Sequence, residues 1–153
     1  MAQLDIGQTK ESSAWVYDTL SYATGKLIVW GITYSSYEAC PSFAGKKIFI
    51  TTISNEDKPQ NTIQLMEVSG AADAPVYGSI TGQCSISEDL SIACSDSLIN
   101  GQYVDPTEKE KGYEEKVTSL CTRKYKIEDN GIIKELENKK SPEKTAKKYD
   151  KEN

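Results

Sequence analysis

The sequence contains no histidine, and this absence removes several kinds of chemistry at once. Its 153 residues also include only four cysteines, none of them in a C-x-x-C pair. Without histidine, Ser–His and Cys–His nucleophile systems are excluded, and a structural zinc site would need four scattered thiolates. The chain has no glycine-rich phosphate loop, zinc-protease helix or calcium loop. We therefore expect no catalytic residues, no metal and no cofactor.

Paired carboxylates are the remaining route to hydrolysis, as in glycosidases. The candidates are Glu88-Asp89 and Glu114-Glu115. Successive residues of a strand point to opposite faces, so neither pair places two acids on one face of a strand. The sequence therefore predicts a protein that is not an enzyme.

Long apolar runs are also absent. No segment approaches the ~18 apolar residues of a membrane-spanning helix, so no membrane association is expected. The start, Met1-Ala2-Gln3, is not a signal peptide. We interpret it as replacing an upstream leader or domain, so the chain can be a fragment of a larger protein.

The net charge of −5 is unevenly distributed. Residues 138–153 hold six lysines and three acids, which leaves 12 basic and 20 acidic residues in 1–137. An acidic body argues against nucleic acid and anionic membranes and suits a basic partner, whose approach it would accelerate. The alternative is that the acidity only keeps the domain soluble.

The prediction of the fold starts from the stretch Gln83–Asp96. Cys84 and Ile86 alternate with serines, and Ile92 and Cys94 repeat the pattern after the polar break Glu88-Asp89. Period-2 alternation predicts strands with one buried face and one small, polar face. The stretch is either a tight hairpin or two strands that each carry one end of a disulfide into the core.

The four cysteines are Cys40, Cys84, Cys94 and Cys121. Each lies in or beside a predicted strand, which favours two disulfides in a secreted domain over four buried thiols of a cytosolic protein. The sequence does not choose among the three possible connectivities.

Further strands are predicted at Leu27–Tyr37, Lys46–Ser54, Asn61–Ser69, Glu114–Ile127 and Ile132–Leu136, with Asn130-Gly131 as a hairpin turn. Residues 15–22 are either a short strand or a helical turn, and Pro106–Lys111 could form a helical turn capped by Asp105. In the third strand, alternation places Ile63 and Leu65 opposite Met66 and Val68. The fold class is therefore all-β, a two-sheet β-sandwich over 1–137, with a disordered or helical Lys-rich tail over 138–153; a barrel remains possible.

Four features together resemble a known family. They are a strand led by Gly25-Lys26-Leu27 and closed by Cys40-Pro41, the C-S-I-S run at Cys84, the pair Cys94-Ser95, and Val117–Cys121 leading into Arg123–Asp129. This pattern, over about residues 20–137, resembles the secreted poxvirus immune-evasion domains. These include the viral CC chemokine inhibitor and the SECRET domain appended to viral tumour-necrosis-factor receptors.

The resemblance implies a secreted viral decoy that binds host chemokines on an exposed acidic sheet face and blocks them from their receptors. Matching flanks, together with our reading of the nearby acids, give the expected chemokine-binding residues: Tyr22, Ile28, Gln83, Ser85, Glu88, Asp89, Glu114, Glu115, Lys116, Val117 and Ser119.

Differences from the family change which of its members the chain is expected to resemble. The chemokine inhibitor carries acids where this chain has Gln83 and Ser85, and it has a long acidic loop and further cysteines that this chain lacks. The shorter receptor-appended domain fits better, and the chain could be part of a larger viral receptor. The alternative function is another secreted β-sandwich interaction module, an adhesin or a protease inhibitor.

Overall fold

The protein consists of β-strands and short connections in all the residues that the computed structural model describes, which are 11–36, 42–73, 75–107 and 112–149. The strands are β1 (Glu11–Tyr22), β2 (Gly25–Ser36), β3 (Ser42–Ser54), β4 (Pro59–Asp73), β5 (Val76–Ile86), β6 (Ser91–Val104), β7 (Tyr113–Ile127), β8 (Ile133–Lys140) and β9 (Lys144–Tyr149). The all-β prediction is confirmed, and residues 15–22 belong to a strand and not to a helical turn.

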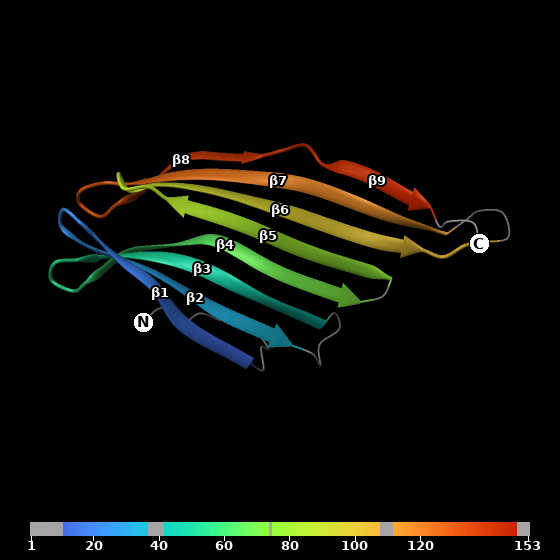
Figure 1. Ribbon diagram of the computed structural model, residues 1–153, viewed down its shortest axis with the longest axis horizontal. Helices are drawn as coiled ribbons and strands as arrows, with labels where there is room; N and C mark the ends of the chain where they lie inside the picture. Colours follow the sequence, from blue (N-terminus) through green and yellow to red (C-terminus); the bar gives the residue numbers. More distant parts are fainter. Residues whose placement is uncertain (1–10, 37–41, 74, 108–111, 150–153) are drawn as a thin grey trace.

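The strands form one antiparallel sheet in the order of the chain, from β1 to β8 (Figure 1). The exception is β9, which returns to β7 and pairs with its first half, while β8 pairs with its second half. Pairing therefore gives a single sheet in which β1 forms one edge and β8 with β9 form the other.

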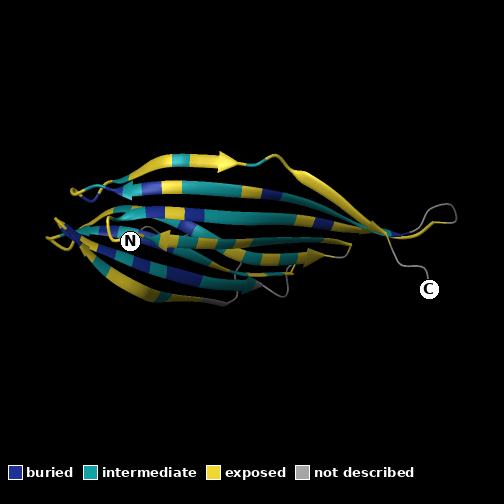
Figure 2. Ribbon diagram, turned by 45° about the horizontal axis from the view of Figure 1, so that its top comes forward, coloured by how far each residue is buried: buried dark blue, intermediate teal, exposed yellow. Residues whose placement is uncertain are grey.

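The sheet divides between β4 and β5. These two strands pair only from Ser69–Asp73 with Val76–Ile80, at the hairpin that joins them. Beyond it, β1–β4 (the first half) and β5–β9 (the second half) diverge and pack against each other near the opposite end. The core there combines both halves and contains Tyr22, Leu27, Ile50, Leu65, Ile92, Cys94, Tyr125 and Ile127. In Figure 2 the buried segments lie mainly toward this end, whereas β9 is exposed throughout.

The cysteine-bracketed stretch is a tight hairpin, the first of the two alternatives. Cys84 and Cys94 lie directly opposite each other on β5 and β6 and form a disulfide, with Cα atoms 4.1 Å apart. The prediction of a second disulfide that includes Cys121 is wrong, because Cys121 is a free thiol. Its neighbours across the strands are Asp96 and Lys140, so no cysteine is opposite it. Cys40 lies outside the described residues.

The predicted alternation of β4 is wrong after Leu65, because the strand contains a β-bulge there. The register with β3 shifts between Ile48 and Phe49, which pair with Met66 and Gln64, so that Leu65 is the extra residue. Leu65 is 1% exposed, and Met66 packs against the same core instead of pointing away from it. Alternation alone cannot reveal an inserted residue.

The C-terminal segment is not disordered or helical where it is described. The predicted domain boundary at 137/138 falls inside β8, and β9 follows after Ser141-Pro142. Pairing with β7 supplies main-chain hydrogen bonds, so the segment becomes a strand without burying an apolar face. The predicted helical turn also fails at Pro106 and Thr107, which are irregular, while 108–111 lie outside the described residues.

Candidate functional site

The predicted binding residues fall into two groups that lie near opposite ends of the sheet. Tyr22, Ile28, Gln83, Ser85, Glu88 and Asp89 lie near the hairpin turns at the core end. Glu114, Glu115, Lys116, Val117 and Ser119 lie on the first half of β7. Thr122 is the β7 residue in register with Gln83, and it lies eight positions along the strand from Glu114, roughly 27 Å away. The residues predicted to form one binding face therefore lie in two separate groups on the sheet.

Three hairpin turns at the core end share one construction. In the turn between β5 and β6, the Ser87 amide donates to the Ser91 carbonyl and the Leu90 amide to the Ser87 carbonyl, both at 2.9 Å. The same pair of bonds closes the β3–β4 turn and the β7–β8 turn. Each loop contains a residue in the left-handed region, at φ 58° for Asp57, 63° for Leu90 and 84° for Gly131. This is the three-residue hairpin loop that ends in a bulge, and it exposes the residues before the left-handed position.

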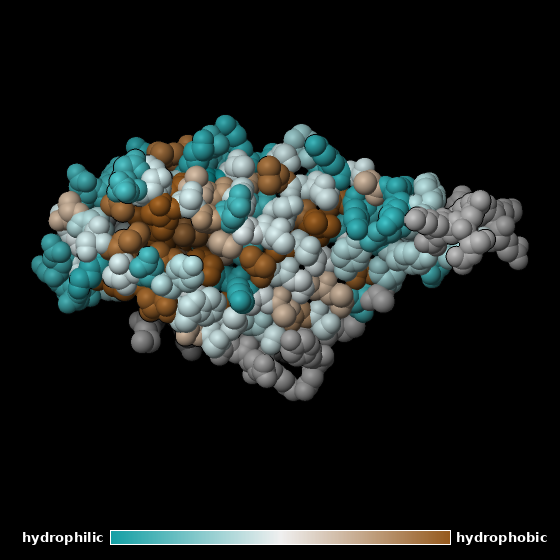
Figure 3. All heavy atoms as spheres, in the orientation of Figure 1, coloured by the Kyte–Doolittle hydropathy of each residue, from teal (hydrophilic) through white to brown (hydrophobic). Residues whose placement is uncertain are grey.

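Each of the three turns also carries two acidic residues. They are Glu56 and Asp57, Glu88 and Asp89, and Glu128 and Asp129, which we call the acidic end; all are exposed except Glu128, which is half-buried. In Figure 3 hydrophilic residues form the tip of the molecule at this end, next to a larger apolar surface.

Hydrogen bonds between loops hold the acidic end together. The Asn55 amide donates to the Thr24 carbonyl at 3.1 Å, and the Thr24 hydroxyl donates to the Asp129 carbonyl. The Ile127 amide donates to the Leu90 carbonyl at 3.2 Å. Turns that are more than 30 residues apart in the sequence therefore form one surface.

Lysines neutralise only part of this surface. Lys58 pairs with Glu56 at 2.6 Å, Lys26 with Asp57 at 3.9 Å, and Lys126 with Asp89 at 2.9 Å. Hydrogen bonds from Lys126 and Ser91 lower the pKa of Asp89 to about 2. Among the described residues, Glu88, Glu128 and Asp129 have no ion-pair partner. The acidic end therefore keeps free negative charge.

Tyr22 supports this end from inside the first half, whereas Ile28 alternates to the other side of β2 from the core residue Leu27. The Tyr22 hydroxyl donates to the Ile53 carbonyl at 3.1 Å and lies 2.9 Å from Gln60 Oε1, and burial raises its pKa. Tyr22 is 9% exposed, so it does not offer the contact surface that the resemblance implied. Ile28 is half-buried.

Gln83 and Ser85 lie on the side of the second half that faces away from Cys84 and the core. Direct pairing puts Ala93 and Ser95 of β6 and Thr122 and Lys124 of β7 on this outer side as well. Small side chains leave a hollow of about 460 Å³ over these residues, and a second of about 290 Å³ adjoins it at Gln83 and Ser95. This outer side reaches the acidic end, because Ser85 precedes the Glu88 turn.

The acids on the first half of β7 are paired with lysines. Glu114 accepts a hydrogen bond from Tyr77 at 2.6 Å and pairs with Lys116 at 3.2 Å, while Glu115 pairs with Lys147 at 3.8 Å. By register, the outer side of β7, β8 and β9 carries Lys116, Lys124, Lys139, Lys144 and Lys148 against Glu114 and Glu137. Glu115, Val117 and Ser119 alternate to the other side, where Ser119 is buried. The acidic end therefore keeps unpaired acids, whereas Glu114 and Glu115 of β7 are each paired with a lysine.

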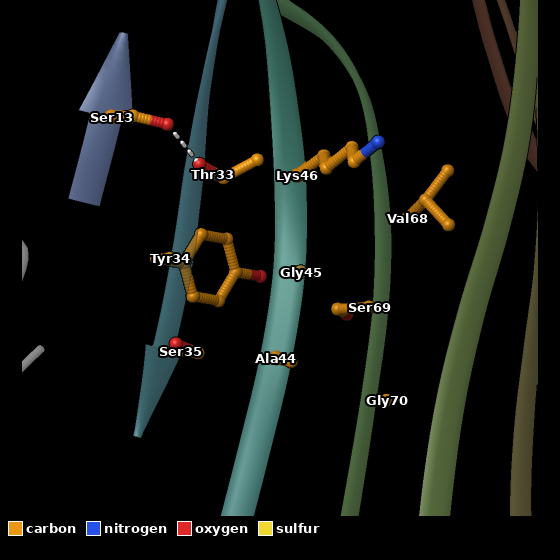
Figure 4. Close-up of a pocket in the computed structure, with 10 residues that line it drawn as sticks. All are labelled: Ser13, Thr33, Tyr34, Ser35, Ala44, Gly45, Lys46, Val68, Ser69 and Gly70. Atoms are coloured by element: carbon orange, nitrogen blue, oxygen red, sulfur yellow. Dashed lines mark hydrogen bonds between the residues drawn. The ribbon is translucent and has the colours of Figure 1, made fainter. Parts of the chain in front are cut away.

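A hollow of about 940 Å³ was missed by sequence reasoning. It lies on the first half away from the turns, and Figure 4 shows its lining of Ser13, Thr33, Tyr34, Ser35, Ala44, Gly45, Lys46, Val68, Ser69 and Gly70. Small residues spread over four strands form no motif, so only the pairing brings them together.

Comparison with known proteins gives no match for this chain, whether with family models, curated proteins or solved structures. No group of side chains that could hold a metal ion occurs within the described residues. The described part also contains no helix long and apolar enough to cross a membrane.

Proposed function

We propose that this chain is a secreted, non-enzymatic decoy that binds a small basic protein of the chemokine class and blocks its receptor contacts. In this proposal the two halves act as the two layers of a β-sandwich. The acidic end is the observation that carries the proposal. Three turns with the same geometry present six carboxylates against three lysines, on a scaffold fixed by a shared core.

In the proposed mechanism, charge and shape act at different steps of binding. Exposed acids such as Glu88 and Asp129 accelerate the encounter with a cationic protein, because a surface of one sign steers an oppositely charged partner. The hollow beside Gln83 and Ser85 then accepts a side chain of the partner, since its small residues leave space over the sheet. The lysines of β7–β9 repel the same partner and orient it toward the turns.

Surface plasmon resonance with a panel of chemokines at two salt concentrations tests the proposal. We expect binding whose association rate falls as salt increases. Reversing Glu88→Lys together with Asp129→Lys should slow association by about tenfold at low salt. Glu114→Lys with Glu115→Lys is the matched control, since it changes the net charge equally at the other end of the sheet.

Two outcomes would contradict the proposal. If no chemokine binds, the alternative of an adhesin or protease inhibitor gains support, and binding to proteases and to extracellular matrix proteins is then the next measurement. If the two charge reversals slow association equally, overall charge and not the acidic end determines the encounter.

A further inference from the structure

The two edges of the sheet differ in how they resist pairing with another strand. The edge formed by β8 and β9 is interrupted at Ser141-Pro142 and carries six lysines: Lys134, Lys139, Lys140, Lys144, Lys147 and Lys148. Lysine, proline and short strands are the devices that keep an edge from pairing. A second strand cannot dock along this edge without facing these charges.

The β1 edge lacks most of these devices. It runs over 12 residues, contains no lysine, and has Asp18 as its one charged residue from Ser13 to Tyr22. Its protection is a single bulge at Tyr17, between Val16 and Asp18. Beside that bulge two large apolar side chains point to solvent, Val16 at 65% exposed and Tyr17 at 76%.

Val16 is also the end of an apolar row that crosses the first half. Val16 pairs with Trp30, and Trp30 pairs with Phe49 on the next strand. The rings of Trp30 and Phe49 stack with centroids 4.6 Å apart. Within the part of the chain that the structure describes, the row ends at Val16 on the β1 edge.

We propose that two copies of this chain form a symmetric dimer in which their β1 edges pair antiparallel. The two-fold axis brings Val16 and Tyr17 of each copy together and extends the apolar row from one first half into the other. With the axis at Val16, this residue faces its own copy, and Asp18 faces Ala14 of the other copy and not an acid. The lysine edges stay outside, so assembly stops at two copies and does not continue into a fibre. The acidic ends of the two copies then point in opposite directions.

Sedimentation velocity over a dilution series tests this proposal. The wild-type chain should sediment with twice the mass of one chain at the highest concentrations. Val16→Lys should raise the dimer dissociation constant by more than about tenfold, because each new lysine faces its own copy in an apolar row. Leu136→Lys on β8 is the matched control: Leu136 is 58% exposed, lies on the other edge, and should leave the dimer intact.

Tyr17→Lys provides a second disruption at an exposed position, and circular dichroism should show that all three variants keep the wild-type fold. A wild-type chain that is monomeric at every concentration would overturn the proposal. So would a dimer that survives both β1 substitutions, or one that Leu136→Lys disrupts as strongly as they do. Each outcome is independent of whether a chemokine binds.

Discussion

The two halves of the sheet are stabilised in different ways. The first half packs aromatic and aliphatic side chains, with Trp30 stacked on Phe49 and with Leu27 and Ile50 fully buried. The second half relies on covalent and ionic contacts. It holds the disulfide Cys84–Cys94, and seven of the ten ion pairs among the described residues lie within it.

One of these ion pairs, Arg123 with Asp96, also contacts the first half. Arg123 and Asp96 are paired and mostly buried in the second half, and Arg123 also donates to the Leu65 carbonyl of the first half at 2.8 Å. Asp96 Oδ1 and Arg123 Nε have no hydrogen-bond partner among the described residues. At this contact the first half therefore contributes apolar side chains and a main-chain acceptor, and the second half contributes a charged pair. Because the second half depends on a disulfide and on ion pairs, its stability should be the more sensitive to reductant, salt and pH.

The largest loss of stability is expected from a substitution of Gly131, which lies where the two halves meet. Gly131 has φ 84°, and an added Cβ would lie 2.4 Å from the Tyr22 hydroxyl oxygen and 2.1 Å from Gln60 Oε1. Gly131→Ala should lower the free energy of unfolding by about 3 kcal/mol, from backbone strain and overpacking together. Urea denaturation measures the change. Gly70→Ala is the control, because its Cβ would meet only the Gly78 carbonyl at 3.9 Å. Equal stability of the two variants would mean that this contact between halves is not needed.

The second largest loss of stability is expected from removal of the disulfide. Replacing Cys84 and Cys94 together by alanine removes the cross-link of the β5–β6 hairpin, and we expect a loss of about 2–3 kcal/mol in the free energy of unfolding. Hydrogen exchange should accelerate first in β5 and β6 and leave β2 and β3 protected. Cys121→Ala, which removes a free thiol, should change stability by less than about 1 kcal/mol. Simultaneous loss of protection in both halves would contradict the contrast drawn between them.

The smallest effect concerns pH and the acidic end. The pKa of Asp89 is lowered from 3.8 to about 2 by the hydrogen bonds from Lys126 and Ser91. Because the folded-state pKa is the lower one, Asp89 stabilises the protein above pH about 4, and this contribution is lost as the pH falls toward about 2. Asp89→Asn should flatten this part of the stability profile in denaturation experiments.

Lys126→Gln should flatten the same part of the profile, because it removes the partner that lowers the pKa of Asp89. A wild-type profile that both variants retain would show that this exposed pair does not contribute to the pH dependence.

Strands and turns could be predicted because their signals are local. Alternation around Cys84 and Cys94 predicted two strands with a hairpin as one of two alternatives, and the pair Asn130-Gly131 predicted a turn whose glycine has the required positive φ. The bulge at Leu65, the free thiol of Cys121 and strand β9 depend on which strand lies opposite, and a single sequence does not contain that information. The acidic end was missed for the same reason. Glu88 was recognised, but Glu56 and Asp129 join it only through pairings over long distances in the chain.

The order of the strands has a consequence for folding. Every strand from β1 to β8 pairs with its neighbour in the sequence, so the hairpins can form early and independently from local contacts. The contact of Thr24 with Asp129 spans 105 residues and must wait until both halves exist. We therefore expect the surface made by the three turns to appear late in folding, so that an incompletely folded chain does not yet present it.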